Sequence, residues 1–196
     1  MADLWTSDSA ARWRDERARY DEVIAAQGVA RLAELDALYR DELPALIAAR
    51  KAPHVTHAEM VRVTEWKMAR GIWRPRNLAL VRGNDPALVE RTSTAALARI
   101  PHPSEPVALM SKLAGVGPAT ASAVIAAAAP DVYPFFDELV AAQVGLGQVT
   151  FTPREYARYA EALRDRAAKL GDGWTPSDVE RALWAHVGGK KGSKRT

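Results

Sequence analysis

The strongest constraint on the fold lies between Leu113 and Ile125, where the chain reads Leu-Ala-Gly-Val-Gly-Pro-Ala-Thr-Ala-Ser-Ala-Val-Ile. Two glycines separated by one residue and followed by proline and small residues predict a tight turn that opens onto a helix. The first backbone amides of a helix have no intrahelical acceptor, and the helix dipole adds partial positive charge there. The turn is therefore a candidate site for an anion such as a phosphate.

Helix-start and helix-stop signals recur along the whole chain, whereas strand signals are weak. Thr56-His-Ala-Glu59 and Thr152-Pro-Arg-Glu155 are capping boxes, in which the threonine and the glutamate each satisfy a backbone amide. Helices are expected over residues 8–26, 29–50 with a kink at Pro44, 56–70, 78–81, 87–99, 104–113, 118–129, 138–144, 152–170 and 175–188. The pattern predicts an all-α protein with about eight to ten helices.

The composition excludes several classes of protein. The chain has 196 residues, of which 48% are hydrophobic, and this is enough for one substantial core. The absence of cysteine excludes a cysteine nucleophile, a disulfide framework, a thiolate zinc site and a cysteine-ligated iron–sulfur cluster. No signal peptide and no membrane-spanning apolar run is recognisable. We expect a cytoplasmic protein without a metal site, associated with the nucleoid if the source is bacterial.

The formal net charge of +3 comes from the C-terminal end of the chain. Four of the 27 basic residues lie in residues 188–196, namely Lys190, Lys191, Lys194 and Arg195. The rest of the protein has 23 basic and 24 acidic residues and therefore carries a net charge of −1. We therefore divide the chain into one all-α unit, residues 1–187, and a basic tail that is expected to be disordered. Nucleic-acid binding would need a local patch, with the tail either aiding it or serving solubility alone.

A local cationic patch lies between Trp66 and Asn84. Five cations and no acidic residue fall in this segment: Lys67, Arg70, Arg74, Arg76 and Arg82. Trp66 and Trp73 alternate with these cations, and guanidinium groups beside aromatic rings suit phosphate contact and base stacking. The structural alternative places both tryptophans in the core and pairs the arginines with acids such as Glu59 and Glu65. We favour that alternative for the tryptophans, whereas the two interpretations of the cations are nearly balanced.

The sequence from Leu113 to Ala121 resembles the hairpin of the helix-hairpin-helix superfamily of DNA glycosylases, whose pattern is Leu-Pro-Gly-Val-Gly, one further residue and Thr-Ala. In that family an essential aspartate follows the second hairpin glycine by about twenty positions. Here Asp137 lies twenty positions after Gly117, with Pro134 just before it. The resemblance covers residues 104 to 140, with the hairpin motif at 104–129. Taken together, the hairpin and the cationic segment more narrowly resemble an uncharacterised branch of the family.

The resemblance implies a function and a set of site residues. Backbone groups of the hairpin would hold a phosphate of duplex DNA, often through a bound monovalent cation, at Gly115, Val116, Gly117, Ala119 and Thr120. Four side chains would add backbone contacts: Lys67, Arg70, Arg74 and Arg76. Asp137 would stabilise the cationic sugar as a flipped-out base departs. Bifunctional members carry a Schiff-base lysine where this chain has Ala119, so the resemblance implies monofunctional hydrolysis of an N-glycosidic bond.

The chain also departs from the family. The usual Val-Asp-Thr-His run is here Phe-Asp-Glu-Leu at residues 136–139, and a glutamine-rich helix is missing. Asp137 also precedes Glu138-Leu-Val, where an aspartate is favoured as a helix N-cap, although capping and catalysis can coexist. Three functions therefore stay open: a DNA-repair glycosylase, a non-catalytic DNA-binding module, and a helical protein-interaction scaffold.

Overall fold

The computed structural model describes residues 3–193, and the described part of the chain contains helices and no strands. In chain order the helices are α1 (Ala10–Ala18), α2 (Tyr20–Ala26), α3 (Leu32–Ala37), the π-helix η1 (Leu38–Glu42), α4 (Leu43–Ala48), α5 (His57–Arg70), α6 (Pro75–Arg82), α7 (Pro86–Leu97), α8 (Glu105–Met110), α9 (Pro118–Ala128), α10 (Glu138–Gln143), α11 (Pro153–Leu170), α12 (Pro176–His186) and α13 (Gly189–Ser193). The all-α prediction is confirmed. None of the helices within residues 3–193 is long and apolar enough to cross a membrane.

The capping boxes begin helices where the sequence places them. Thr56 accepts from the backbone amide of Glu59 at 3.3 Å, and Glu59 accepts from the amide of Thr56 at 2.8 Å. Thr152 and Thr175 form the same reciprocal arrangement at the starts of α11 and α12. These helix starts are predictable because every atom of the cap lies within four residues of the others.

Two expected helices are divided into shorter ones, which, together with α13, is why residues 3–193 contain more helices than predicted. The segment expected to kink at Pro44 passes through η1, whose last turn closes with a bond from the amide of Leu43 to the carbonyl of Leu38. Proline has no backbone N–H, so the regular α-helical ladder is interrupted next to it. Near the N-terminus, α1 and α2 are separated at Arg19.

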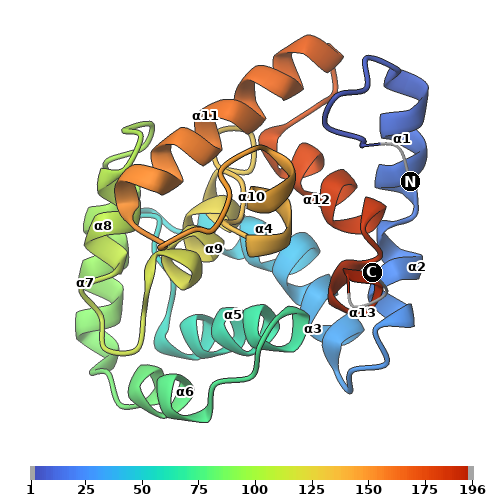
Figure 1. The fold of residues 1–196 in the computed structure, drawn as a ribbon. Coiled ribbons are helices and arrows are strands. Elements are labelled where there is room, and N and C mark those ends of the chain that lie inside the picture. Colours follow the sequence, from blue (N-terminus) through green and yellow to red (C-terminus); the bar gives the residue numbers. More distant parts are fainter. Residues whose placement is uncertain (1–2, 194–196) are drawn as a thin grey trace.

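Helix α9 forms the centre of the molecule. Its residues from Thr120 to Ala127 are all buried, as expected for a helix that is apolar and small on every side. It contacts α4, α5 and α8. Figure 1 shows α9 and α10 in the middle, with α5 and α6 below them, α7 and α8 to the left, α11 across the top, and α1 and α12 to the right. The turn that precedes α9 and the segment that follows it, which carries Asp137, lie at the same region of the molecule.

The C-terminal segment differs from the disordered tail expected from Gly188 onward. Residues Gly189–Ser193 form α13, which contacts α2, α10 and α12. Lys190 donates from Nζ to the carbonyl of Gly71 at 2.8 Å. A Cβ at Gly189 would lie 2.7 Å from the ring of Trp184, so glycine permits this close approach. Lys194 and Arg195 lie outside the described residues.

Candidate functional site

The turn between α8 and α9, residues 111–117, packs against α6, and we call it the α8–α9 turn. Gly115 has φ +75°, and a Cβ at this position would lie 2.5 Å from the carbonyl oxygen of Asn77 and 2.8 Å from the Cβ of Leu80. Only glycine tolerates both the backbone conformation and the contact. Gly115 is therefore required by the packing of the turn on α6.

Asn84 fastens the same turn to α6. Its side chain donates to the carbonyl of Ala114 at 2.9 Å and accepts from the amide of Ala114 at 3.0 Å. It also donates to the carbonyl of Val81 at 3.0 Å. The buried amide thus satisfies the backbone of two segments that are 30 residues apart. The sequence carries no local signal for this role, since the partner lies on another element.

The opposite side of the α8–α9 turn is open. Gly117 N-caps α9 with φ −92°, and a Cβ there would meet no atom within 4 Å. The backbone amides of Gly117, Ala119 and Thr120 donate to no acceptor in residues 3–193. Because Pro118 has no amide to offer, these three amides are the free donors of the helix N-terminus. Val116 differs from its neighbours, since its side chain is 5% exposed and packs in the core.

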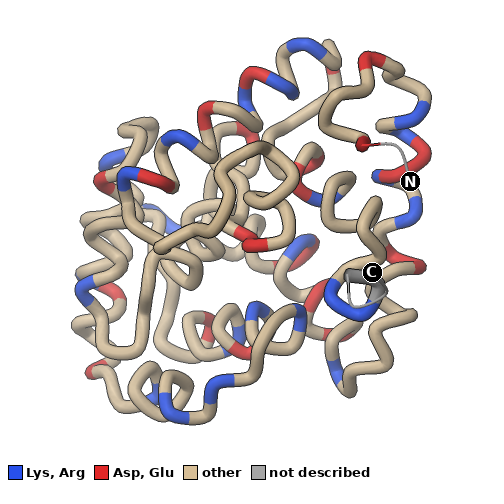
Figure 2. The backbone as a smooth tube through the Cα atoms, in the orientation of Figure 1, with Lys and Arg blue, Asp and Glu red and all other residues tan. Residues whose placement is uncertain are grey.

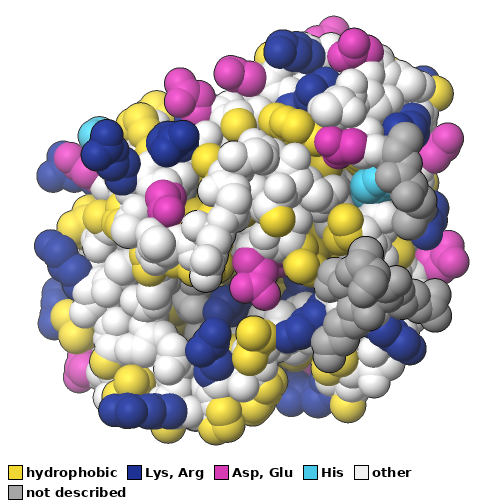
Figure 3. Space-filling model, in the orientation of Figure 1, with side chains coloured by type: hydrophobic (Ala, Val, Ile, Leu, Met, Phe, Trp, Pro, Cys, Tyr) yellow, Lys and Arg dark blue, Asp and Glu magenta, His cyan; other side chains and the backbone are white. Residues whose placement is uncertain are grey.

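A cavity of about 230 Å³ lies between the α8–α9 turn, the loop from α5 to α6 and the start of α10. It brings together most of the residues selected from the sequence: Lys67, Arg70, Arg74, Gly117, Ala119, Thr120 and Asp137. Gly115, Val116 and Arg76 are not part of its lining. Figure 3 shows Lys and Arg side chains around a hollow in the middle of this face, with an acidic group above it. Figure 2 shows Lys and Arg positions along the backbone of α5 and α6.

Asp137 is both a helix cap and a wall of the cavity. Its Oδ1 accepts from the amides of Leu139 at 2.8 Å and Val140 at 3.4 Å, which confirms the capping role. The residue is 8% exposed and lines the cavity rather than lying sealed beneath the neighbouring phenylalanines. Oδ2 accepts no hydrogen bond from the described residues. One carboxylate oxygen is thus engaged by the fold and the other is available.

The segment that carries Asp137 is held in place from two helices. The amide of Phe136 donates to Oγ of Ser122 on α9 at 2.9 Å. From α11, the hydroxyl of Tyr159 donates to the carbonyl of Phe135 at 2.8 Å, and that of Tyr156 donates to the carbonyl of Pro134 at 3.1 Å. Burial raises the pKa of both tyrosines, so they remain protonated donors. The sequence gives no pattern that singles out these residues.

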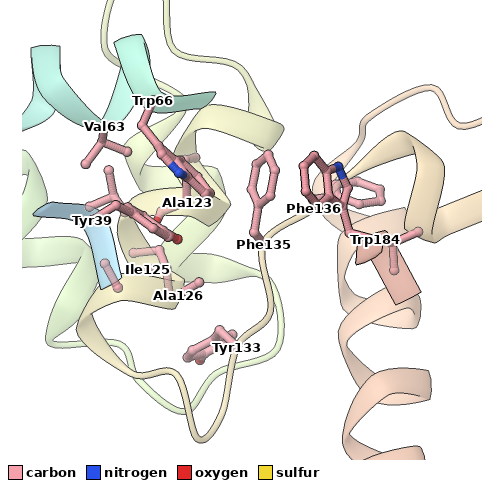
Figure 4. Close-up of a cluster of buried hydrophobic side chains, with 14 of the residues drawn as sticks. Tyr39, Val63, Trp66, Ala123, Ile125, Ala126, Tyr133, Phe135, Phe136 and Trp184 are labelled. Carbon is pink, nitrogen blue, oxygen red and sulfur yellow. The ribbon is translucent and has the colours of Figure 1, made fainter. Parts of the chain in front are cut away.

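Aromatic rings form one wall of the cavity. Phe135, Phe136 and Phe151 line it, and the rings of Phe136 and Phe151 lie edge to face with centroids 5.0 Å apart. Figure 4 shows Phe135 on the Trp66 side of the buried cluster and Phe136 on the opposite side. Phe151 adopts φ +53°, a conformation that costs a non-glycine residue about 1–2 kcal/mol. A bulky residue in this conformation beside a cavity fits the tendency of functional sites to hold backbone strain.

Arg70 reaches the cavity from the core rather than from the surface. It is 2% exposed, and its Nη2 lies 2.5 Å from Oε1 of Glu180. Its guanidinium lies over the rings of Trp184, Phe135 and Trp66, at 4.4, 5.2 and 5.4 Å from their centroids. Burial raises the pKa of Glu180 to about 7, although Arg70 opposes the shift. This placement differs from the surface phosphate contact expected for Arg70.

Lys67 occupies the cavity without a fixed partner. The side chain is half-buried and forms no hydrogen bond or ion pair with the part of the chain that the structure describes. Burial lowers the pKa of its ammonium group, and the nearby charge of Arg74 lowers it further. Asp137 and Glu138 act in the opposite direction. Lys67 shares the lining of the cavity with Arg74 of the cationic loop and with Asp137 and Glu138 at the start of α10.

Arg74 and Arg76 are the exposed cations of the patch. Neither forms a hydrogen bond or ion pair within residues 3–193, so both guanidinium groups are available to a ligand. Arg82 is different, because it pairs with Glu65 at 2.7 Å as the structural alternative predicts. Glu59, the other acid considered, pairs with Arg50 instead, at 2.6 Å.

The two tryptophans of the patch have opposite environments. Trp66 is 1% exposed and stacks on Tyr39 with ring centroids 3.6 Å apart, so the core interpretation is confirmed for it. Trp73 is 52% exposed and follows Ile72, which is 43% exposed and lines the cavity. The core interpretation is wrong for Trp73, because the loop between α5 and α6 carries it away from the core. An exposed aromatic ring next to the free guanidinium group of Arg74 suits stacking on a base.

No protein-family model, curated protein or solved structure matches this chain. Within the described residues, no three His, Cys, Asp or Glu side chains converge as metal ligands do. The chemistry of the site therefore has to be argued from the cavity itself.

Proposed function

We propose that this protein is a DNA-binding protein of the repair type with a helix-hairpin-helix, and that it hydrolyses the N-glycosidic bond of a damaged base. The observation that carries the proposal is the meeting of Asp137 with the free amides of the α8–α9 turn in one cavity. The sequence resemblance pairs the same two elements at the same separation. The cationic loop at the cavity supplies the charge that a nucleic-acid partner needs.

The α8–α9 turn and the exposed arginines would hold the DNA backbone. The amides of Gly117, Ala119 and Thr120 suit a phosphate at a helix N-terminus, while Arg74 and Arg76 add charge. The carbonyls of Gly115 and Val116 accept no hydrogen bond from the described residues, and carbonyl oxygens fit the monovalent cation that the resemblance implies. Such an ion would add positive charge at the phosphate. The duplex would then lie across α6 and the turn.

The cavity is of a size for a single base rather than a larger ligand. Its volume of about 230 Å³ is below the roughly 300 Å³ at which pockets for drug-sized ligands begin. A base rotated out of the duplex would lie against the aromatic wall, and Trp73 would stack beside the vacated position. The available oxygen of Asp137 would face the sugar and stabilise the positive charge that develops as the base leaves. The base leaves with the electron pair of the N-glycosidic bond, a water molecule adds to C1′, and the proton that the water loses is balanced by the proton that the departed base takes up.

Replacement of Asp137 by asparagine tests the catalytic step. Asparagine caps a helix as well as aspartate does, so the Asp137→Asn variant removes the charge and keeps the cap. Incubation with duplexes carrying alkylated, deaminated or oxidised bases should yield abasic sites with the wild type. The variant should be slower by about 100-fold or more. Absence of abasic product from every duplex, or equal rates for the two proteins, would remove the enzymatic claim.

A non-catalytic DNA-binding module is the second candidate, and the capping role of Asp137 favours it because capping alone explains the aspartate. Both candidates predict that the Arg74→Gln, Arg76→Gln double variant binds duplex DNA less tightly. The slope of log K against log salt should fall by about 0.9 for each phosphate that the variant no longer neutralises. Arg158→Gln is the matched control, since Arg158 is exposed on α11, across the molecule from α6 (Figure 1). No binding at low salt would leave only the scaffold interpretation.

A further inference from the structure

A second cavity, of about 130 Å³, lies between α5, α9, α12 and η1. Arg70 and Phe135 line both this cavity and the first one, so the two are neighbours. Asp137 and the α8–α9 turn take no part in lining the second cavity. The proposed hydrolysis therefore gives this space no role.

The inner walls of the second cavity are largely aromatic. The rings of Tyr20, Tyr39, Trp66 and Phe135 line it, together with the small side chains of α9. Figure 4 shows Tyr39, Trp66 and Phe135 on the same side of the buried cluster. An apolar cavity of about 150 Å³ holds one benzene molecule, so a single aromatic ring is the apolar group that suits these walls.

Two of the guanidinium groups that line the cavity hold buried N–H donors without an acceptor. The Nη atoms of Arg70 contact Glu180, whereas its Nε forms no hydrogen bond with the described residues. Nε of Arg40 is also buried without a hydrogen bond to this part of the chain, although it lies 2.8 Å from Oδ2 of Asp36. Buried donors in proteins nearly always have an acceptor, so a ligand that supplies acceptors is expected at this place.

Arg181 adds a third guanidinium group. Its Nε donates to the carbonyl of Ser177 at 3.3 Å and its Nη2 to Oδ1 of Asp178 at 2.7 Å, which leaves Nη1 for a ligand. The side chains of Arg40 and Arg181 are 23% and 27% exposed, so they mark the mouth of the cavity. Glu180 also lines it, but both of its oxygens already accept from Arg70. The cavity thus offers cationic donors and no free carboxylate.

We infer that this cavity is a second binding site, and that its ligand is a small aromatic carboxylate. The ring lies among the aromatic walls, and the carboxylate accepts from Arg40 and Arg181 at the mouth. A planar guanidinium group matches a carboxylate with paired, charge-assisted hydrogen bonds. A ligand without a carboxylate would leave the donors unused, and one without a ring would leave the apolar walls uncovered. The inference does not depend on DNA binding.

Benzoate is the probe that tests the inference, and benzamide is its uncharged counterpart of similar shape. Calorimetric titration of the full-length protein measures both affinities. Benzoate should bind at least about tenfold more tightly than benzamide, because charge strengthens hydrogen bonds to guanidinium groups. Benzoate should also shift the indole N–H resonance of Trp66. The resonance of Trp13 should stay in place, because Trp13 is equally buried but lies outside the lining.

Two variants locate the site. Ala127→Met fills the cavity from α9 and should abolish benzoate binding, whereas Ala128→Met, outside the lining, should retain it. Arg181→Gln should weaken binding about tenfold, and the half-buried Arg164, also outside the lining, supplies the control Arg164→Gln. If circular dichroism shows that Ala127→Met does not fold, Arg181→Gln decides. No benzoate binding, equal affinity for benzamide, or unchanged affinity in Arg181→Gln would overturn the inference.

Discussion

Gly115 and Gly117 are two residues apart and belong to the same turn, but they face different surroundings. Gly115 has φ +75° and lies against the backbone of α6, where a side chain would overlap Asn77. Gly117 has φ −92° and faces open space at the cavity. The first glycine is needed to build the site, and the second leaves room for a ligand to approach it. A Gly-x-Gly pattern thus combines two requirements that substitutions can separate.

The largest expected effect is at Gly115. Gly115→Ala should lower the free energy of unfolding by about 3 kcal/mol, because left-handed strain adds to overlap with α6. Urea unfolding of the variant and the wild type measures the difference. Any DNA binding should weaken together with stability. A change below about 1 kcal/mol would mean that the turn can move away from α6 without cost.

Asn84 should have the next largest effect. Asn84→Ala removes the bonds that fasten Ala114 to α6 and leaves part-buried backbone groups without these partners, at a cost of about 2 kcal/mol. Asn84→Asp is the control, since the carboxylate keeps the acceptor for the amide of Ala114 and loses the donor. Its stability should lie below the wild type as well. If Asn84→Ala has the same free energy of unfolding as the wild type, the hydrogen bonds of Asn84 do not stabilise the packing of the turn on α6.

The smallest effect on stability should be at Gly117. Gly117→Ala meets no neighbouring atom, so the free energy of unfolding should change by less than about 1 kcal/mol and can increase. DNA affinity should nevertheless fall about tenfold, or 1.4 kcal/mol, because the added methyl group separates the phosphate from the free amides. Fluorescence anisotropy with a labelled duplex measures this. Unchanged affinity would show that the open side of the turn does not contact the backbone.

The helices were the most predictable part of this protein. Capping boxes at Thr56 and Thr152 and the stop at Gly71 all lie where the sequence indicates. The burial of α9 also follows from its composition alone. The tail was less predictable, because α13 is held by hydrogen bonds to Gln27 and Gly71, which are distant along the chain.

The candidate site was predictable in its main members but not in their roles. The sequence places three cations close together, at Lys67, Arg70 and Arg74. Their spacing does not indicate which of them is buried and which is exposed. The structure buries Arg70 against Glu180, half-buries Lys67 and leaves Arg74 exposed. The same contrast applies to Trp66 and Trp73. Burial is a property of the surrounding elements, so a local pattern cannot assign it.

The sequence by itself determined the all-α class, the helix starts and the separation of Asp137 from Gly117. These are local properties, because a cap or a turn is completed by atoms a few residues away. Only the tertiary structure decided that Gly115 faces α6, that Asn84 holds the turn, and that the carboxylate, the free amides and a lysine share one cavity. Those contacts join residues far apart in the chain, such as Asn84 and Ala114, which are 30 positions apart. Their energies exist only once the packing of α9 has brought the elements together.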